Sequence, residues 1–384
     1  MTLSKRTDEE AAREFAVAPR FPSATSEILD LTLEIRLVTV LYGGGARAGY
    51  PDEITPFRPS SVRGHLRYWW RATRGAEFAS WEALRTRESQ IWGDTDHKSP
   101  VRIRVDCPDS LKPARYSLRR YENVPEIRYA LFPPFEAKLK DLDSNRLLEG
   151  GGFRLKLSIH KDRTDLQKDI DSALWAWLNF GGLGARTRRG AGALFCQQYA
   201  GWDPAKLSGD GELREWPALK GSTILWGTKR QPWLDCWRQI MRLYREFRQE
   251  RIPPGRGKTQ WPEPDEIRSI RLHREQPGPA GFPRGALGLP ILFHFKDRGD
   301  PKDQNLNIEE PEGRMTSPVI LRPFAVSPTE AVPMLLVLNS PAAPGLYLHQ
   351  TGEKRIQVGF GERRAIEELI QFAAVRWETA AMRA

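Results

Sequence analysis

The stretch Leu31-Thr-Leu-Glu-Ile-Arg-Leu-Val38 alternates apolar and polar residues, the period of a β-strand that is buried on one face. The segments 101–105 and 153–159 repeat this alternation. Between the first two segments, Ser60 or Ser61 can cap a helix that runs to about Arg74. The first part of the chain therefore predicts a strand, a helix and two further strands.

A second helix is predicted over residues 165–180, and Gly181 and Gly182 end it, as glycine does at helix C-termini. A short strand follows near residues 193–197. The first half thus has the order strand, helix, strand, strand, helix, strand. This is the order of the βαββαβ ferredoxin-like unit, the topology that RNA-recognition domains share.

A length of 384 residues suits about two domains. The composition turns polar and rich in Gly and Pro around residues 203–222, where we place a domain boundary. The second half holds a long helix near 232–250, apolar strands at 291–295, 319–321 and 334–338, and an amphipathic helix over about 362–382. We predict an α+β chain with an N-terminal arm (1–28), a first ferredoxin-like domain (29–205) and a second one (206–384) of open strand order.

Charge favours an acidic partner. Lys and Arg total 59 against 49 Asp and Glu, a formal net charge of +10, and a basic excess is typical of nucleic-acid-binding proteins. Cys107, Cys196 and Cys236 lie far apart and form no CxxC pair, so we predict neither a metal site nor a disulfide and expect a reducing, cytoplasmic location. No apolar run of about 18 residues occurs and the first residues are charged, so no membrane span or secretory signal is predicted. We also predict no cofactor.

The helix that starts near Val62 has two distinct faces. At about 100° per residue, Val62, Leu66, Trp69 and Thr73 fall on one side. Four arginines fall together on another, which we call the arginine ridge: Arg63, Arg67, Arg71 and Arg74. A guanidinium is a fixed fork of donors that suits phosphate. Because no Glu is interleaved, we expect the ridge to contact RNA or a protein partner, although arginine stems covering apolar surface remain an alternative.

A second basic motif is the glycine loop, residues 181–192, with the sequence GGLGARTRRGAG. Glycines allow close approach of the backbone to a ligand and expose N–H groups, and Arg186, Arg188 and Arg189 add charge beside them. We expect this loop to bind a polyanion backbone. A flexible surface loop with incidental charge is the alternative.

Candidate catalytic groups are sparse. His65 lies in the arginine-bearing helix and could transfer a proton, but a packing role is the more ordinary one. Asp94, Asp96 and His97 are close enough in sequence to suggest a metal, yet a polar turn before the strand at 101–105 accounts for them more simply. Most of the 13 tryptophans are expected to fill the core.

Several of these segments resemble one known family. Residues 55–71 (TPFRPSSVRGHLRYWWR), the Trp92-Gly93 turn before Val101, and the blocks at 282–290 and 314–323 resemble the first RAMP-type subunit of the Cmr complex, the type III-B CRISPR effector. The glycine loop resembles the loop that RAMP proteins share. These matches run in order from about residue 31 to 323.

The resemblance implies two ferredoxin-like domains and a non-catalytic subunit that contacts the 3′ region of the guide RNA and aids target RNA capture in antiviral defence. Guide RNA, target RNA and other Cmr-type subunits would be its partners. The predicted RNA-binding residues are Arg58, Arg63, Arg67, Arg71, Arg74, Gly181, Gly182, Gly184, Arg186, Thr187, Arg188, Arg189 and Gly190.

Two alternatives stay open. Some RAMP proteins process guide RNA, so the chain could be an endoribonuclease with His65 as its proton-transfer group. It could also be an assembly subunit whose arginine ridge meets an acidic partner protein.

Overall fold

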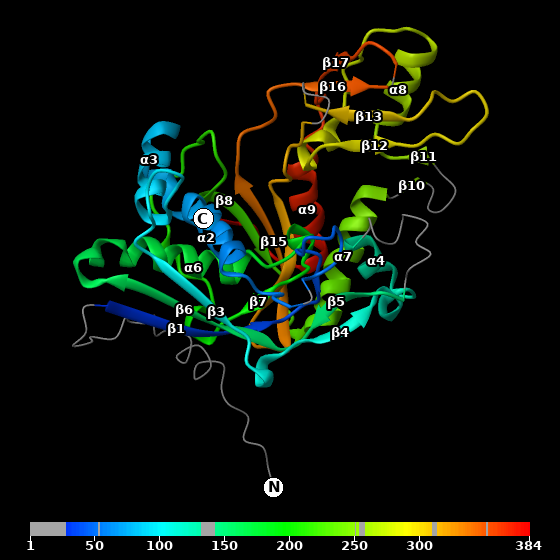
Figure 1. Ribbon diagram of the computed structural model, residues 1–384. Helices are drawn as coiled ribbons and strands as arrows, with labels where there is room; N and C mark the ends of the chain where they lie inside the picture. The colour runs from blue at the N-terminus through cyan, green and yellow to red at the C-terminus, as the bar shows by residue number, and fades with distance from the viewer. Residues whose placement is uncertain are drawn as a thin grey trace.

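The structure is a computed structural model that describes residues 28–52, 54–131, 143–249, 251–252, 258–308, 313–350 and 352–384. The predicted arm at 1–28 lies outside these residues except for Ile28, which begins the first strand. Figure 1 shows the main body of the chain with a smaller lobe above it.

The first half is built on a four-stranded antiparallel sheet. Its strands are β1 (Ile28–Leu37), β3 (Arg102–Asp106), β6 (Gly152–His160) and β7 (Leu194–Phe195), in the spatial order β3-β6-β1-β7. Helix α2 (Pro59–Thr73) connects β1 to β3, and α6 (Gln167–Phe180) connects β6 to β7. The order strand, helix, strand, strand, helix, strand that the sequence predicts is therefore present.

The second half repeats this arrangement. Its sheet contains β8 (Ala218–Trp226), β14 (Val319–Ala325), β15 (Glu330–Asn339) and β18 (Met382–Arg383), in the order β14-β15-β8-β18, with the short β9 (Gln231–Pro232) beside β15. Helix α7 (Trp233–Gln249) follows β8, and α9 (Ala365–Trp377) precedes β18. Each strand of the second sheet occupies the same place as its counterpart in the first sheet. The structure thus gives the strand order of the second half, which the sequence left open.

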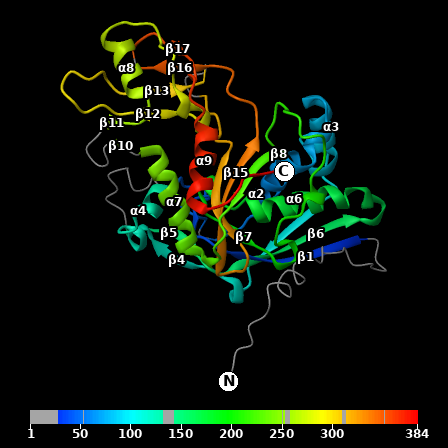
Figure 2. The same ribbon diagram turned by 180° about the vertical axis from the view of Figure 1, so that it is seen from behind.

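The two sheets and their helices stack in layers (Figures 1 and 2). Helices α2 and α6 pack between the two sheets, and α7 and α9 cover the far side of the second sheet. Alternate residues of β15 accordingly enter different cores: Met334 and Leu336 face α2 and α6, whereas Leu335 and Val337 face α7 and α9. The first sheet buries one face only, so β1 alternates between buried and more exposed positions.

Insertions extend both halves. In the first, β2 (Leu41–Tyr42), β4 (Ala114–Ser117) and β5 (Asn145–Glu149) form a small sheet near α4 (Pro125–Ala130), and α3 (Trp81–Trp92) packs beside α2. In the second, α8 (Glu263–Leu272) covers a sheet of β12 (Ile291–Phe293), β13 (Gln304–Asn307), β16 (Leu346–His349) and β17 (Ile356–Val358). This set, the insertion lobe, has its own apolar core. A two-stranded ribbon, β10 (Arg251–Ile252) and β11 (Lys258–Thr259), follows α7.

Some sequence predictions need correction. Neither Ser60 nor Ser61 caps α2, because the helix begins at Pro59 and Arg58 is the N-cap residue. The fixed φ of proline suits the first helical position. The boundary predicted at 205/206 falls between β7 and β8. One core cluster joins Leu33 and Leu66 of the first half to Ile224 and Leu336 of the second. The division into two domains therefore stays a prediction.

Candidate nucleic-acid interface

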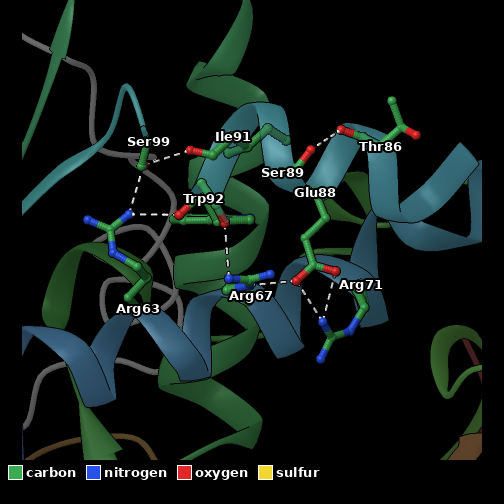
Figure 3. A network of polar contacts seen from close by, with 10 residues as sticks. Arg63, Arg67, Arg71, Thr86, Glu88, Ser89, Ile91, Trp92 and Ser99 are labelled. Atoms are coloured by element: carbon green, nitrogen blue, oxygen red, sulfur yellow. Dashed lines mark hydrogen bonds and ion pairs between the residues drawn. The ribbon is translucent and has the colours of Figure 1, made fainter. Parts of the chain in front are cut away.

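The arginine ridge lies along α2, as its spacing predicts. Val62, Leu66, Trp69 and Thr73 are buried on the opposite side. The ridge is only partly exposed, however, because α3 packs beside it and supplies acceptors for its guanidiniums (Figure 3).

Arg63, Arg67 and Arg71 all donate to α3 or to the turn after it. Arg63 donates to the carbonyls of Trp92 (3.2 Å) and Val101 (2.9 Å) and to Ser99 Oγ (2.7 Å). Arg67 Nε and Arg71 Nη1 share the carboxylate of Glu88, at 2.6 and 2.7 Å. The side chain of Glu88 is only 4% exposed. No Glu is interleaved in α2 itself, and the counter-charge of the ridge comes from α3. Contact of the ridge with RNA stays a prediction.

Arg74 and Arg58 also have partners within the chain. Arg74 pairs with Glu77 at 2.9 Å and approaches Asp169 of α6 at 3.8 Å. Arg58 donates to the carbonyl of Gly44, in a glycine turn that packs against Gly184 of the glycine loop. The first and last predicted arginines of this region thus tie α2 to neighbouring segments, and their contact with RNA stays a prediction.

The glycine loop packs tightly within the protein. A Cβ at Gly181 would stand 2.4 Å from Trp69 Nε1, and one at Gly190, where φ is +87°, would stand 2.6 Å from Trp237 Nε1. The N–H groups of Ala185 and Gly192 donate to the carbonyls of Tyr42 and Val40. Glycine is required here by close packing of the chain against itself, a use that the sequence did not suggest.

The arginines of the glycine loop reach across to the second half. Arg188 donates to the Ser317 carbonyl and to the hydroxyl of Tyr68 on α2 (2.9 Å). Arg189 donates to the Val319 carbonyl (3.2 Å) and to the Tyr244 hydroxyl (3.0 Å). All four acceptors are neutral, and among the described residues neither arginine has a carboxylate partner.

Arg186 differs from its neighbours. It adopts a left-handed conformation with φ of 64°, and no side-chain hydrogen bond or ion pair joins it to another described residue. Its partial burial, together with the nearby Arg189 guanidinium, lowers its pKa. A half-buried guanidinium without a counter-charge is costly, so Arg186 is the loop residue best placed to gain from an added anion.

A buried arginine that the sequence did not single out joins the two halves. Arg322 of β14 is 1% exposed and donates to the carbonyls of Gly181, Leu194 (3.4 Å) and Pro323 (3.1 Å). Burial lowers its pKa to about 9. Because its acceptors include both ends of the glycine loop region, Arg322 holds that loop against the second sheet.

Comparison with known proteins places these features in a family. A model of the RAMP superfamily matches residues 34–194, from β1 to the start of β7. The "CRISPR system Cmr subunit Cmr1-2" of Pyrococcus furiosus is 31% identical over 180 residues, which cover 43% of this chain and 93% of that protein. The chain belongs to the Cmr1 family of RAMP proteins. The matched region contains the whole glycine loop. It contains none of the residues of the second half that the loop contacts.

Two further likenesses extend this Cmr1-family assignment. The Cmr1-1 subunit of the same organism is 29% identical over 146 residues, covering 38% of this chain and 40% of that protein. The crystal structure of apo Cmr1 from Pyrococcus furiosus shares the fold with a TM-score of 0.50 at 16% identity, over 93% of this chain and 98% of that chain. The family likeness of fold therefore includes the second half.

The candidate catalytic and metal-binding residues of this Cmr1-family chain make ordinary packing and turn contacts. The ring of His65 stacks on Trp177 with centroids 6.1 Å apart, and burial lowers its pKa to about 4. Asp94 accepts from the N–H groups of Asp96 (2.9 Å) and His97 (2.7 Å), so these residues form a polar turn, as the sequence predicts. Within the described ranges, no cluster of metal-ligating side chains occurs and no helix could span a bilayer.

Proposed function

We propose that this chain is a non-catalytic, RNA-binding subunit of a type III-B CRISPR effector complex. In that complex it contacts the 3′ region of the guide RNA and aids capture of target RNA in antiviral defence. Its partners are then guide RNA, target RNA and other Cmr-type subunits. The names of its relatives, which are CRISPR system Cmr subunits, support this assignment.

We further propose that each half is a ferredoxin-like unit. The equal strand orders β3-β6-β1-β7 and β14-β15-β8-β18, each with two helices on one side, support this interpretation. RNA-recognition domains use the same succession of elements. The glycine loop lies where the two units meet, since Arg188 and Arg189 donate to carbonyls beside and in β14.

One observation carries the RNA-binding proposal: the charges of the glycine loop are not neutralised within the described part of the chain. Arg186, Arg188 and Arg189 have no carboxylate partner there, whereas Arg67 and Arg71 of the ridge share Glu88. A phosphate accepts strong, charge-assisted hydrogen bonds from guanidinium groups. The loop therefore offers a better phosphate site than the ridge.

The test is binding of labelled single-stranded RNA to the full chain at several salt concentrations. Arg186→Gln is the informative variant, because Arg186 makes no side-chain bond whose loss would disturb the fold. We expect about a three- to tenfold loss of affinity and a salt dependence reduced by about 0.7 in the slope of log K against log salt, one phosphate contact on a single strand.

Arg85→Gln is the matched control. Arg85 is exposed on α3, and its replacement removes the same charge. Equal affinities of the two variants would contradict the role of the loop. RNA that is recovered cleaved, with cleavage lost in His65→Gln, would favour the endoribonuclease. An absence of binding at low salt would favour an assembly subunit.

A further inference from the structure

A second set of basic and aromatic side chains lies beside the glycine loop, on elements that the sequence did not connect with it. Tyr129 belongs to α4, and Tyr244 and Arg248 belong to α7. The rings of Tyr129 and Tyr244 lie 6.2 Å apart at 51°. The guanidinium carbons of Arg189 and Arg248 lie 4.5 and 5.7 Å from the centre of the Tyr244 ring. Loop, α4 and α7 therefore converge on one pair of tyrosines.

This convergence concentrates positive charge. The guanidiniums that act on Tyr129 are Arg189, Arg248 and Arg284, and Arg186 interacts with Tyr129 and with Arg189. One carboxylate, Glu263, lies among them, and it is fully buried and pairs with Arg284 at 3.1 Å. Among the described residues, no carboxylate lies within ion-pair distance of Arg186, Arg189 or Arg248, and Glu263 acts on Arg248 only from further away. An excess of guanidiniums at one partly buried place is unfavourable unless an anion joins them.

The pKa of the Tyr244 phenol reflects the same concentration of positive charge. Burial would raise its pKa, yet the Arg189 and Arg248 guanidiniums outweigh burial and lower it. Arg189 already uses its donors on the Val319 carbonyl, its own neighbour's carbonyl and the Tyr244 hydroxyl. Within the described ranges, Arg248 bonds the Tyr244 hydroxyl and no other side chain, and Arg186 bonds no side chain or carbonyl. A guanidinium carries five N–H donors. Arg189 has used three of them, so Arg186 and Arg248 hold most of the unused donors at this place.

The surroundings favour a single strand over a duplex. Arg186, Arg248 and Tyr129 are each partly exposed as whole residues, but their polar ends are recessed, since burial acts on all three. A phosphate that reaches recessed arginines must come from a flexible strand. An aromatic ring beside a phosphate site suits an unpaired base, because sequence-tolerant binding of single strands combines basic grooves with stacking on aromatic side chains.

We propose that Arg186, Arg248 and Tyr129 form a seat for one nucleotide of single-stranded RNA, with its phosphate between the two guanidiniums and its base against the Tyr129 ring. This inference rests on the proposed RNA-binding function and adds a contact from the second half to it. The RNA strand then touches both halves at their junction. Arg189 and Tyr244 hold the seat in place through their mutual hydrogen bond.

The experiment uses the full chain and a labelled, unstructured RNA of about 20 nucleotides, single-stranded or annealed to its complement, a length that exceeds a typical single-strand site of about 4–16 nucleotides. We expect Arg248→Gln and Tyr129→Leu each to weaken single-strand binding at least about fivefold. Arg248→Gln also lowers the salt slope by about 0.7. Tyr129→Phe, which keeps the ring, binds like the parent chain.

Arg245→Gln is the matched control, because Arg245 lies on α7, is partly exposed and pairs with no described carboxylate. If Tyr129→Leu does not fold, Arg248→Gln and its salt slope decide. Parental binding by Arg248→Gln, with loss in Arg186→Gln, would overturn the seat and leave the proposed function standing. Duplex bound as tightly as the single strand would overturn the strand preference. A parent chain that binds no RNA would overturn both.

Discussion

Glu88 is the residue whose replacement most directly tests what the arginine ridge does. Its carboxylate accepts from Arg67 Nε at 2.6 Å and from Arg71 Nη1 at 2.7 and 2.8 Å. Glutamine has nearly the same shape, but it carries no charge and one of its two polar atoms donates instead of accepting. Glu88→Gln therefore leaves two guanidiniums without their counter-charge while the packing of α3 on α2 is kept.

The expected cost follows from burial. Loss of one partner from a fully buried ion pair costs about 3–5 kcal/mol. Here the carboxylate is 4% exposed, but the side chains of Arg67 and Arg71 are 35% and 28% exposed. Water can replace part of the lost interaction, so we expect about 2–3 kcal/mol. With an unfolding entropy of about 2.1 cal/mol/K per residue, the melting temperature falls by about 3 °C.

Thermal unfolding of Glu88→Gln and Glu82→Gln provides the comparison. Glu82 is exposed on the same helix, so its replacement changes the net charge equally. Equal melting temperatures would refute the conclusion that α3 neutralises the ridge. RNA binding gives a second readout: a clear gain of affinity in Glu88→Gln, absent in Glu82→Gln, would show that the released arginines can hold phosphate.

Two further predictions concern His65 and Gly190. The pKa of His65 in the folded chain, about 4, lies below its usual 6.5, so the unfolded chain binds more protons between these values and stability falls as pH drops from 6.5 towards 4. Melting temperatures over that range should vary less in His65→Gln, and an unchanged pH profile would contradict the burial of His65. Gly190→Ala places a Cβ 2.6 Å from Trp237 Nε1, whereas Gly150→Ala, also at positive φ, meets no atom within 4 Å. Gly190→Ala should therefore melt at least about 2 °C lower than Gly150→Ala, and equal melting would contradict the tight packing of the loop.

The parts of the fold that the sequence predicts are those with one exposed face. β1 alternates because solvent lies on one side of its sheet, and alternation can be read directly. β14 is buried at every position, since helices cover both sides of the second sheet. A strand buried on both faces has no alternation, so the strand order of the second half could not be derived from pattern.

The candidate site was predictable only within single segments. The spacing of Arg63, Arg67 and Arg71 places them on one face of α2, as the structure shows. Glu88, the acceptor that Arg67 and Arg71 share, belongs to a helix that the sequence analysis did not identify. Tyr129 and Arg248 approach the glycine loop only because α4 packs on α7. Contacts between segments that lie far apart in the sequence decide which charges are neutralised. The residue pattern of a single segment does not reveal such contacts.

The insertion lobe has a consequence for the order in which the chain folds. Its β12 and β13 precede the β14–β15 hairpin in sequence, and its β16 and β17 follow that hairpin. β13 and β16 nevertheless pair directly. Closing a loop costs more entropy when the intervening chain is long and unstructured, and a local hairpin forms sooner than a distant pairing. We therefore expect formation of the β14–β15 hairpin to bring β13 and β16 together, and the lobe to complete its sheet after that hairpin has formed.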